Sequence, residues 1–235
     1  MSRIILAADT GTAANTVAVC KGGAILAEVL VESPRLHSER LLGAVDWVLK
    51  EAGLDIHDVD TLAISIGPGS FTGLRIGAST WKGLALAANK PLVAVPTLDA
   101  LARVAAHAEG TVVAALDARM HEVFGAVYEV RDGVRTRLTE DRVCPLPELL
   151  AGLSGKIHCI GDGFTAYRDE ARATLPDASF APPWLNGPRA AAVAAEANDL
   201  LDVGARAVAA EVSPVYLRAS QAEVNRDRKL GATSA

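Results

Sequence analysis

Two short stretches of this chain have residue types and spacings that could bind phosphate. The longer one runs from Gly67 to Gly77 and follows an apolar run over 61–66. Its glycines and proline favour a tight turn after a buried strand, and Ser70 or Thr72 can then cap a helix. A strand, a glycine-rich turn and a helix N-terminus form a phosphate-binding shape, because free backbone N–H groups lie at the positive end of the helix dipole.

The standard nucleotide motifs are not met in this stretch. A Walker loop requires Lys after its last glycine, whereas Leu74 follows Gly73, and the dinucleotide fingerprint would need a glycine at Thr72. No G-x-S-x-G nucleophile elbow surrounds Ser70. The stretch is therefore either an unusual phosphate cradle or a tight strand-to-helix connection that binds nothing.

The second stretch is Asp9-Thr10-Gly11-Thr12, which ends an apolar strand expected over 4–8. An aspartate at a strand end can hold a magnesium-bound water, while the following Gly and Thr offer N–H groups to a phosphate. The same residues also suit a hairpin turn that Asp9 and Thr10 simply cap. Spacing alone leaves both interpretations open.

The middle of the chain repeats this opening pattern. An apolar strand over 111–116 ends at Asp117, and a second strand over 123–130 leads to a glycine turn, as at the N-terminus. The repeat predicts a duplicated fold in which Asp9 and Asp117 occupy equivalent positions. Hydrophobic periodicity predicts an α/β chain, with further strands near 16–20, 25–31, 92–95, 156–160 and 178–180 and helices near 37–52, 72–88, 98–108, 164–174 and 188–201.

Composition excludes several classes of protein. The chain has 235 residues, half of them hydrophobic, but no apolar run reaches the roughly 18 residues of a membrane span. We expect a cytoplasmic protein. Its formal net charge of −5 argues against strong nucleic-acid binding by the chain alone, because phosphate neutralisation dominates such binding. Arginines over 131–142 alternate with acids and predict a solvated surface.

The helices expected over 37–52 and 72–88 carry more apolar surface than one buried face needs. Leu74, Gly77 and Trp81 share one stripe of the second helix, and Trp47 lies off the stripe of the first. Glycines such as Gly73 cost helix stability, about 1 kcal/mol each relative to alanine, which close backbone approach could offset. These five residues are either buried within the chain or part of an interface with a partner.

Several motifs together resemble one family of proteins. They are Asp9 to Thr12, the Gly67–Gly77 string, Asp117-Ala118-Arg119 with Glu122-Val123, and Pro214-x-Tyr216-Leu217-Arg218. In these motifs the chain is similar, over almost its whole length to about Arg218, to the TsaB (YeaZ) family of bacterial tRNA threonylcarbamoyladenosine biosynthesis proteins. The resemblance implies an actin-like, Hsp70-like (ribonuclease H-like) duplicated two-lobe fold. We expect one lobe from 1–103 with 190–218, a second from 104–189, and a disordered tail over 219–235.

The resemblance also implies a function. It predicts a non-catalytic scaffold that binds and activates the metal-containing paralogue TsaD, with TsaE and a threonylcarbamoyl-AMP synthase completing the pathway. The implied contact, and that of a homodimer formed in isolation, is a bundle of the helices near 37–52 and 72–88. Its candidate residues are Trp47, Gly73, Leu74, Gly77 and Trp81. tRNA would be reached through the complex.

The resemblance predicts neither a metal site nor a catalytic residue in this chain. Thr97 and Leu101 stand where TsaD carries the two histidines of its metal-binding H-x-x-x-H, and neither side chain replaces an imidazole ligand. We therefore expect no peptidase or transferase chemistry that depends on a metal held by this chain.

For nucleotide the resemblance implies a degraded cleft. Asp9, Thr10, Gly11 and Thr12 keep the first phosphate loop, but Ala118 and Arg119 follow Asp117 where glycine is expected, and Gly161 and Gly163 only partly match the adenosine segment. We expect no tightly bound cofactor and weak binding of ATP with magnesium. The alternative is an active actin-like ATPase or small-molecule kinase that uses Asp9 and Asp117.

Overall fold

The structure is a computed structural model, and it describes residues 2–32, 40–205 and 208–218. The predicted tail over 219–235 and the first residues of the helix predicted over 37–52 lie outside these ranges. The strands are β1 (Ile4–Asp9), β2 (Ala14–Lys21), β3 (Ala24–Glu32), β4 (Thr61–Ser65), β5 (Leu92–Val95), β6 (Gly110–Arg119), β7 (Glu122–Arg131), β8 (Val134–Arg137), β9 (Arg142–Cys144), β10 (Ile157–Ile160) and β11 (Ser179–Phe180). The α-helices are α1 (Leu41–Glu51), α2 (Phe71–Ala88), α3 (Thr97–Val104), α4 (Leu146–Leu150), α5 (Gly163–Ala166), α6 (Arg168–Thr174) and α7 (Ala190–Asp202).

The two sheets have the same topology, which confirms the predicted duplication. The first has the order β3-β2-β1-β4-β5, and the second has the order β8-β7-β6-β10-β11 with β9 paired to β7. In both, the first three strands are antiparallel and the last two are parallel to the first. Asp9 at the end of β1 and Asp117 near the end of β6 therefore occupy equivalent places.

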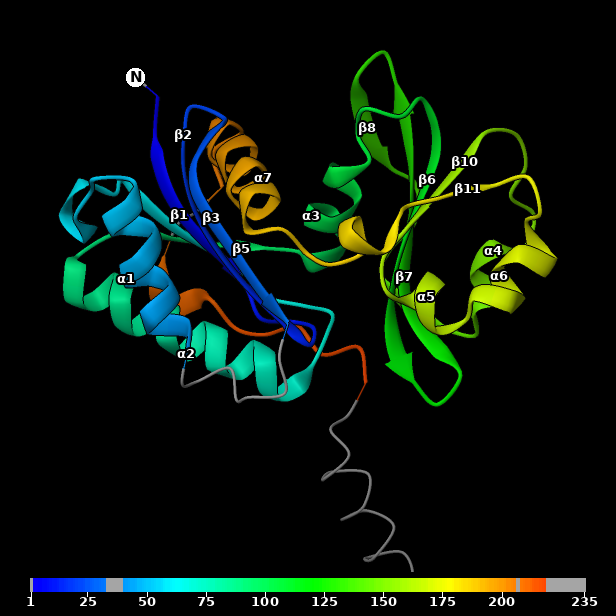
Figure 1. Cartoon of the computed structure of the whole chain (residues 1–235), viewed down its shortest axis with the longest axis horizontal. Coiled ribbons are helices and arrows are strands. Elements are labelled where there is room, and N and C mark those ends of the chain that lie inside the picture. Colours follow the sequence, from blue (N-terminus) through cyan, green and yellow to red (C-terminus); the bar gives the residue numbers. More distant parts are fainter. Residues whose placement is uncertain (1, 33–39, 206–207, 219–235) are drawn as a thin grey trace, which may run out of the picture.

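Each sheet is covered by helices on both faces, so each lobe has two hydrophobic layers (Figure 1). In the first lobe α1 and α2 pack on one face, and α7 packs on the other. In the second lobe α3 covers one face, and α4 to α6 cover the other. Figure 1 shows α7 and α3 between the two sheets, where the lobes meet. Helix α3 packs on β6 and also contacts α7, so it joins the layers of both lobes.

The structure differs from the predicted elements at several boundaries. Helix α2 begins at Phe71, because the Ser70 hydroxyl accepts the Gly73 N–H and caps it. Helix α3 ends at Val104 rather than near 108, and the helix predicted over 164–174 is two short helices. Strands β8 and β9 were not predicted, because arginines interrupt both and neither contains an apolar run like those of the equally short β5 and β10.

Candidate functional site

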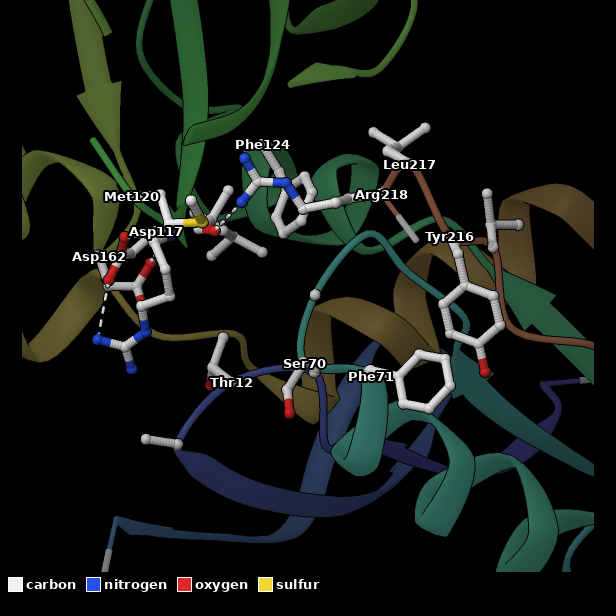
Figure 2. A pocket seen from close by; sticks show the side chains of 17 residues that line it. Thr12, Ser70, Phe71, Asp117, Met120, Phe124, Asp162, Tyr216, Leu217 and Arg218 are labelled. Carbon is white, nitrogen blue, oxygen red and sulfur yellow. Dashed lines mark hydrogen bonds and ion pairs between the residues drawn. The ribbon is translucent and has the colours of Figure 1, made fainter. Parts of the chain in front are cut away.

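A cavity of about 440 Å3 lies between the lobes. It is lined by the β1–β2 turn, the start of α2, the β6–β7 turn and residues 215–218. In Figure 2, Thr12 and Ser70 border it on one side, Phe124 and Arg218 on the opposite side. Of the predicted nucleotide residues, the cavity brings together Gly11, Thr12, Asp117 and Arg119. Asp9, Thr10, Gly161 and Gly163 do not line it.

Asp9 is enclosed by the first lobe rather than presented to the cavity. Its side chain is fully buried at the end of β1, and its Oδ1 accepts the Gly11 N–H at 2.8 Å. Burial raises the pKa of Asp9, and the hydrogen bond from the Gly11 N–H opposes this rise, while Asp9 Oδ2 has no hydrogen-bond partner among the described residues. A side chain added at Gly11 would contact both the Asp9 carboxylate and Leu74. This arrangement favours the interpretation of Asp9 as a turn-capping residue over that of a holder of magnesium-bound water, since its side chain is buried and does not line the cavity.

The glycines of the 67–77 stretch allow helix α2 to contact the β1–β2 turn, the first loop of the chain, directly. A Cβ atom at Gly69 would lie 2.5 Å from the Gly11 carbonyl oxygen, one at Gly73 would lie 2.0 Å from that of Thr10, and one at Gly77 2.3 Å from the Thr10 hydroxyl. The Thr10 hydroxyl donates to the Gly73 carbonyl at 2.8 Å. The glycines thus serve close packing, as predicted, and the neighbour is the chain's own first loop.

The segment 213–218, here called the C-terminal strap, crosses from the first lobe to the second. The Val215 N–H donates to the Ile66 carbonyl at 2.7 Å, and a Cβ at Gly67 would lie 2.4 Å from the Val215 oxygen. Gly67 has a φ of +121°, which favours glycine as well. Leu217 packs against the core of the second lobe. The strap therefore explains why glycine is needed at position 67, two residues after the end of β4.

Both ends of the strap carry specific contacts. Tyr216 packs on Phe71 with a centroid distance of 4.7 Å, and its hydroxyl accepts the Arg75 Nε–H at 3.1 Å. Arg218 donates to the Ala118 carbonyl at 3.0 Å and forms an ion pair with Glu122. The Tyr216-Leu217-Arg218 motif thus joins α2 to the β6–β7 turn along the cavity.

The acids of the second lobe are held by neighbouring groups. Asp117 Oδ1 accepts the Arg119 N–H at 2.8 Å and the Tyr167 hydroxyl at 3.0 Å, and its Oδ2 pairs with Arg119 Nη1 at 3.2 Å. Asp162 Oδ1 accepts the Asp117 N–H at 2.9 Å. Burial raises the pKa of Asp162 to about 6, and the charge of Asp117 adds to the rise. Both Asp117 oxygens therefore have partners within the chain.

The β6–β7 turn has an unfavourable backbone. Arg119, Met120 and His121 have φ values of 63°, 56° and 62°, a left-handed run of three residues with side chains. Such conformations cost on the order of 1 kcal/mol each and persist where surrounding contacts fix them. Here the ion pair of Arg119 with Asp117 and the bonds of Arg218 supply those contacts. The turn holds Arg119 and Met120 exposed at the rim of the cavity.

Four other predicted positions have packing roles. A Cβ at Gly161 would lie 2.0 Å from the Ala115 oxygen, and one at Gly163 would lie 3.0 Å from the same atom. Thr97, at one TsaD histidine position, is buried and accepts the Gly67 N–H at 2.9 Å. Leu101, at the other, is fully buried in the second lobe's core. Among the described residues, no three His, Cys, Asp or Glu side chains gather as a metal site.

The structure corrects most of the predicted partner interface. Gly73, Leu74, Gly77 and Trp81 are buried within their own lobe, and Trp81 is fully enclosed. The first loop and the core of the lobe occupy that face of α2, so these side chains are not at the surface. Trp47 alone of the five is exposed, at 46 %. The exposed apolar residues of this region are Leu42, Trp47 and Leu86.

Comparison with known proteins is consistent with these motifs. The family model described as "TsaD: tRNA N6-adenosine threonylcarbamoyltransferase" matches residues 25–226. The curated protein TsaB of Escherichia coli K12 is 35 % identical over 230 residues, which cover 91 % of this chain and 94 % of that protein. The chain belongs to the TsaB family. TsaB of Haemophilus influenzae is also 35 % identical, over 76 % of this chain and 80 % of that protein.

Solved structures support the same placement. YeaZ from Pseudomonas aeruginosa superposes with a TM-score of 0.79 at 32 % identity, over 92 % of this chain and all of the other. Component A of (R)-2-hydroxyglutaryl-CoA dehydratase from Acidaminococcus fermentans has a TM-score of 0.53 at 12 % identity, over 84 % of this chain and 98 % of that one, a likeness of fold alone. With the duplicated topology, these relatives confirm the predicted two-lobe actin-like fold of this TsaB-family chain.

Two sets of residues were missed by the sequence reasoning. The exposure of Leu86 could have been predicted from helical spacing, because Leu86 lies outside the buried stripe of α2. Spacing places Leu42 with the buried stripe of α1, seven positions before Leu49, although the structure leaves it 56 % exposed. Arg135 and Arg137 were interpreted as solvated, which is wrong: they are largely buried in ion pairs with α3 and α7. Asp141, a partner of Arg137, lies four positions away, but the carboxylates of Asp99 and Glu196 that bury these arginines lie far away in the sequence, so local sequence could not show it. In the described ranges, no helix is both long and apolar enough to cross a bilayer.

Proposed function

We propose that this chain takes part in tRNA threonylcarbamoyladenosine biosynthesis as a non-catalytic subunit that binds and activates TsaD. The names of its curated TsaB relatives give the pathway. The observation that carries the subunit role is the exposed outer face of α1 and α2, which has apolar and small residues that nothing in the described chain covers. We refer to this surface as the α1–α2 face.

The apolar part of the α1–α2 face comes from both helices. Leu86 on α2 is 75 % exposed, while Leu42 and Trp47 on α1 are each about half exposed. The two helices pack side by side on the same sheet layer. Exposed aromatic and aliphatic side chains on neighbouring elements mark interaction surfaces more often than isolated ones do. An apolar helix of a partner would bury these groups.

Gly83 gives the α1–α2 face its most specific feature. It lies in the second half of α2, is exposed, and has nothing within 4 Å of the position of its missing Cβ. Gly73 and Gly77, by contrast, are required by contacts inside the chain. Ser79, Gly83 and Ala87 are spaced four apart and form an exposed line of small residues. Small side chains allow two helices to pack with their axes at the short end of the usual 8–10 Å separation. Close packing against a partner helix would offset the loss of helix stability that Gly83 causes.

The cavity supports a non-catalytic role for this chain. Asp9 is enclosed, the Gly11 N–H is bonded to Asp9, and both oxygens of Asp117 are paired. These are the groups that an actin-like ATPase would need for magnesium and phosphate, which speaks against the ATPase or kinase alternative. We propose that ATP with magnesium binds weakly and that TsaD supplies the metal chemistry.

The remaining partners follow from the same proposal. In isolation the α1–α2 face is proposed to pair with a second copy of the chain, because the same small and apolar line can face itself about a two-fold axis. TsaE and the threonylcarbamoyl-AMP synthase are proposed as further pathway members. tRNA is proposed to bind through the complex, since the net charge of −5 disfavours binding by this chain alone.

The test compares two exposed tryptophans. Trp47→Glu places a charge on the α1–α2 face, whereas Trp184→Glu places the same charge on the second lobe at a tryptophan that is 76 % exposed. With purified TsaD from the same organism, Trp47→Glu should weaken binding at least tenfold by calorimetry, and Trp184→Glu should bind like the wild type. Equal binding by both variants would overturn the assignment of the α1–α2 face.

A further inference from the structure

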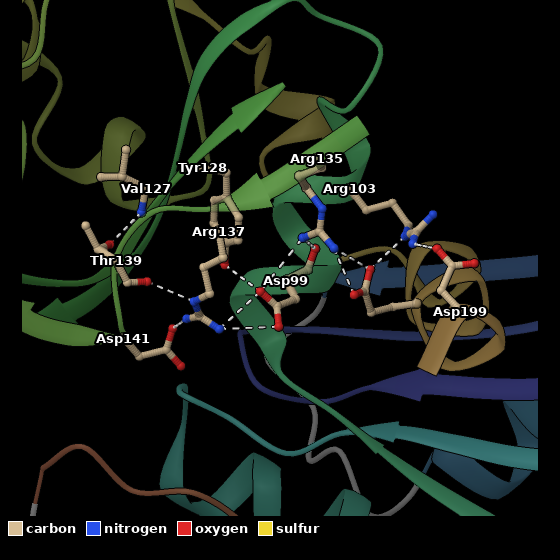
Figure 3. A network of polar contacts seen from close by, with 10 residues as sticks. Asp99, Arg103, Val127, Tyr128, Arg135, Arg137, Thr139, Asp141 and Asp199 are labelled. Carbon is tan, nitrogen blue, oxygen red and sulfur yellow. Dashed lines mark hydrogen bonds and ion pairs between the residues drawn. The ribbon is translucent and has the colours of Figure 1, made fainter. Parts of the chain in front are cut away.

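A network of charged side chains joins the two lobes where α7, α3 and β8 meet (Figure 3). Glu196 on α7 accepts two hydrogen bonds from Arg135 Nη2 on β8, at 2.8 and 2.7 Å. The same carboxylate accepts the Arg103 Nε–H of α3 at 2.8 Å. Arg103 also pairs with Asp199 on α7. One carboxylate of the first lobe thus holds an arginine of the second lobe and one of the connecting helix.

Asp99 on α3 continues the network into the second lobe. Its backbone carbonyl accepts an Arg135 Nη1–H bond at 2.7 Å, and its Oδ1 accepts bonds from Arg137 at 3.1 Å and from the Tyr128 hydroxyl at 2.8 Å. Arg137 pairs in turn with Asp141. The aromatic ring of Tyr128 lies against both guanidinium groups, at 5.2 and 5.6 Å. Arg135 therefore contacts groups of α7, α3 and β7 at once.

Burial makes this network different from an ordinary surface ion pair. The side chains of Arg135 and Glu196 are only 14 % and 10 % exposed. Removing one member of such a pair leaves the other charge unpaired and out of water, which is strongly unfavourable. A fork-shaped guanidinium held by several acceptors also fixes direction as well as distance. Sliding or rotation of β8 relative to α7 would break these bonds together.

The C-terminal strap provides a second connection, along the cavity. It fixes Tyr216 on α2 and Arg218 on the β6–β7 turn, so the lobes are joined both at the α7–α3–β8 network and beside the cavity. Two separate connections resist the hinge motion that a single connection would allow. An enzyme whose lobes close over a bound nucleotide would need that hinge motion, whereas a scaffold does not.

We propose that Glu196 and Arg135 form an interlobe lock, which keeps the two lobes in one relative arrangement. A partner bound on the α1–α2 face would then always find the second lobe at the same position relative to that face. This inference rests on the proposed function for its consequence, though not for the lock itself. The lock is a positioning device: Glu196 and Arg135 line neither the cavity nor the α1–α2 face.

The lock is tested by distances between the lobes in the full chain without a partner. Spin labels at Lys21→Cys and Val134→Cys, both exposed positions on different lobes, report one interlobe distance by pulsed electron resonance. The native cysteines are buried, and burial raises the pKa of Cys20 to about 11 and that of Cys159 to about 12, which disfavours their labelling. The lock predicts one narrow distance distribution, unchanged by ATP with magnesium.

Glu196→Gln should broaden this distribution at least twofold, because a neutral amide cannot hold two arginines. The matched control is Glu129→Gln, which removes a carboxylate from the exposed pair with Arg131 and should leave the width unchanged. Arg135→Lys keeps the charge but loses the fork, so it should fold like the wild type and show an intermediate width. An unchanged width in folded Glu196→Gln and Arg135→Lys would overturn the lock.

The consequence for the partner is measured separately. Glu196→Gln should bind TsaD within about twofold of the wild type, since the α1–α2 face is intact, while its stimulation of TsaD should fall at least tenfold. Full stimulation by a variant with a broadened distance distribution would refute the fixed-position role. If the wild type itself fails to bind TsaD, the proposed function fails, while the distance measurement still decides the lock.

Discussion

At the scale of single residues, the cleft differs most from that of an actin-like enzyme in the burial and pairing of its aspartates. Asp9 is enclosed and its pKa is raised by burial, and Asp162 has a pKa of about 6. Both changes disfavour the charged forms that a magnesium site would use. Asp117 stays at the cavity but is paired with Arg119. The motif residues are present, but their surroundings give them structural roles.

The raised pKa of Asp162 predicts a pH effect on stability. Its folded pKa of about 6 exceeds the ordinary value of 3.8, so the folded state binds the proton more tightly than the unfolded state does. This contribution is complete below about pH 4 and is lost as the pH rises through about 6. Asp162→Asn keeps an acceptor for the Asp117 N–H and removes the titration.

Urea unfolding at pH 4 and pH 7 measures this effect. Between these values the wild type should lose roughly 1–3 kcal/mol of stability relative to Asp162→Asn, by the conversion of about 1.4 kcal/mol per pKa unit. A stability difference that stays constant with pH would show that Asp162 is an ordinary surface acid.

At the scale of elements, helix α2 has two faces with different tasks. Its inner glycines, Gly73 and Gly77, are fixed by contact with Thr10, and its outer glycine, Gly83, is fixed by nothing in the described chain. The sequence showed the excess of glycine and apolar residues in this helix. It could not show which face was inward, because the partner of the inner face, the first loop, lies about sixty positions earlier.

Substitutions at Gly83 separate its effect on the stability of the isolated chain from its effect on partner binding. In the isolated chain the methyl group of Gly83→Ala meets empty space, so this substitution should stabilise the protein by about 0.5–1 kcal/mol through helix propensity. Gly83→Gln should be folded as well, but its longer side chain would separate two packed helices and weaken TsaD binding more than tenfold. Destabilisation by Gly83→Ala in chemical unfolding would show that the helix needs glycine for its own fold.

Much of the fold could be predicted from the hydrophobic patterns of single strands and helices, and the long elements were predicted best. Buried strands such as β1, β4 and β6 have continuous apolar runs, and the repeat of strand, acid and turn revealed the duplication. The site was less predictable. The buried state of Trp81 and the ion pairs of Arg135 depend on contacts between distant segments, which no local pattern encodes. The resemblance identified the family and the fold correctly but could not report how exposed the motif residues are.

At the scale of the whole molecule, the chain is two similar lobes whose contacts include the α7–α3–β8 network and the C-terminal strap. One lobe presents the α1–α2 face and the other presents the exposed β6–β7 turn. The buried network around Glu196 and the C-terminal strap set the position of one relative to the other. This arrangement suits a protein that acts by holding surfaces in place for a partner.

The central claim is that the chain works as a subunit bound to TsaD. The most direct measurement is the mass, by light scattering, of this chain mixed in equal amounts with TsaD from the same organism, with and without nucleotide. The proposal predicts a new species with the mass of a heterodimer, which the Trp47→Glu variant fails to form. Two separate species at micromolar concentration, with or without nucleotide, would contradict it.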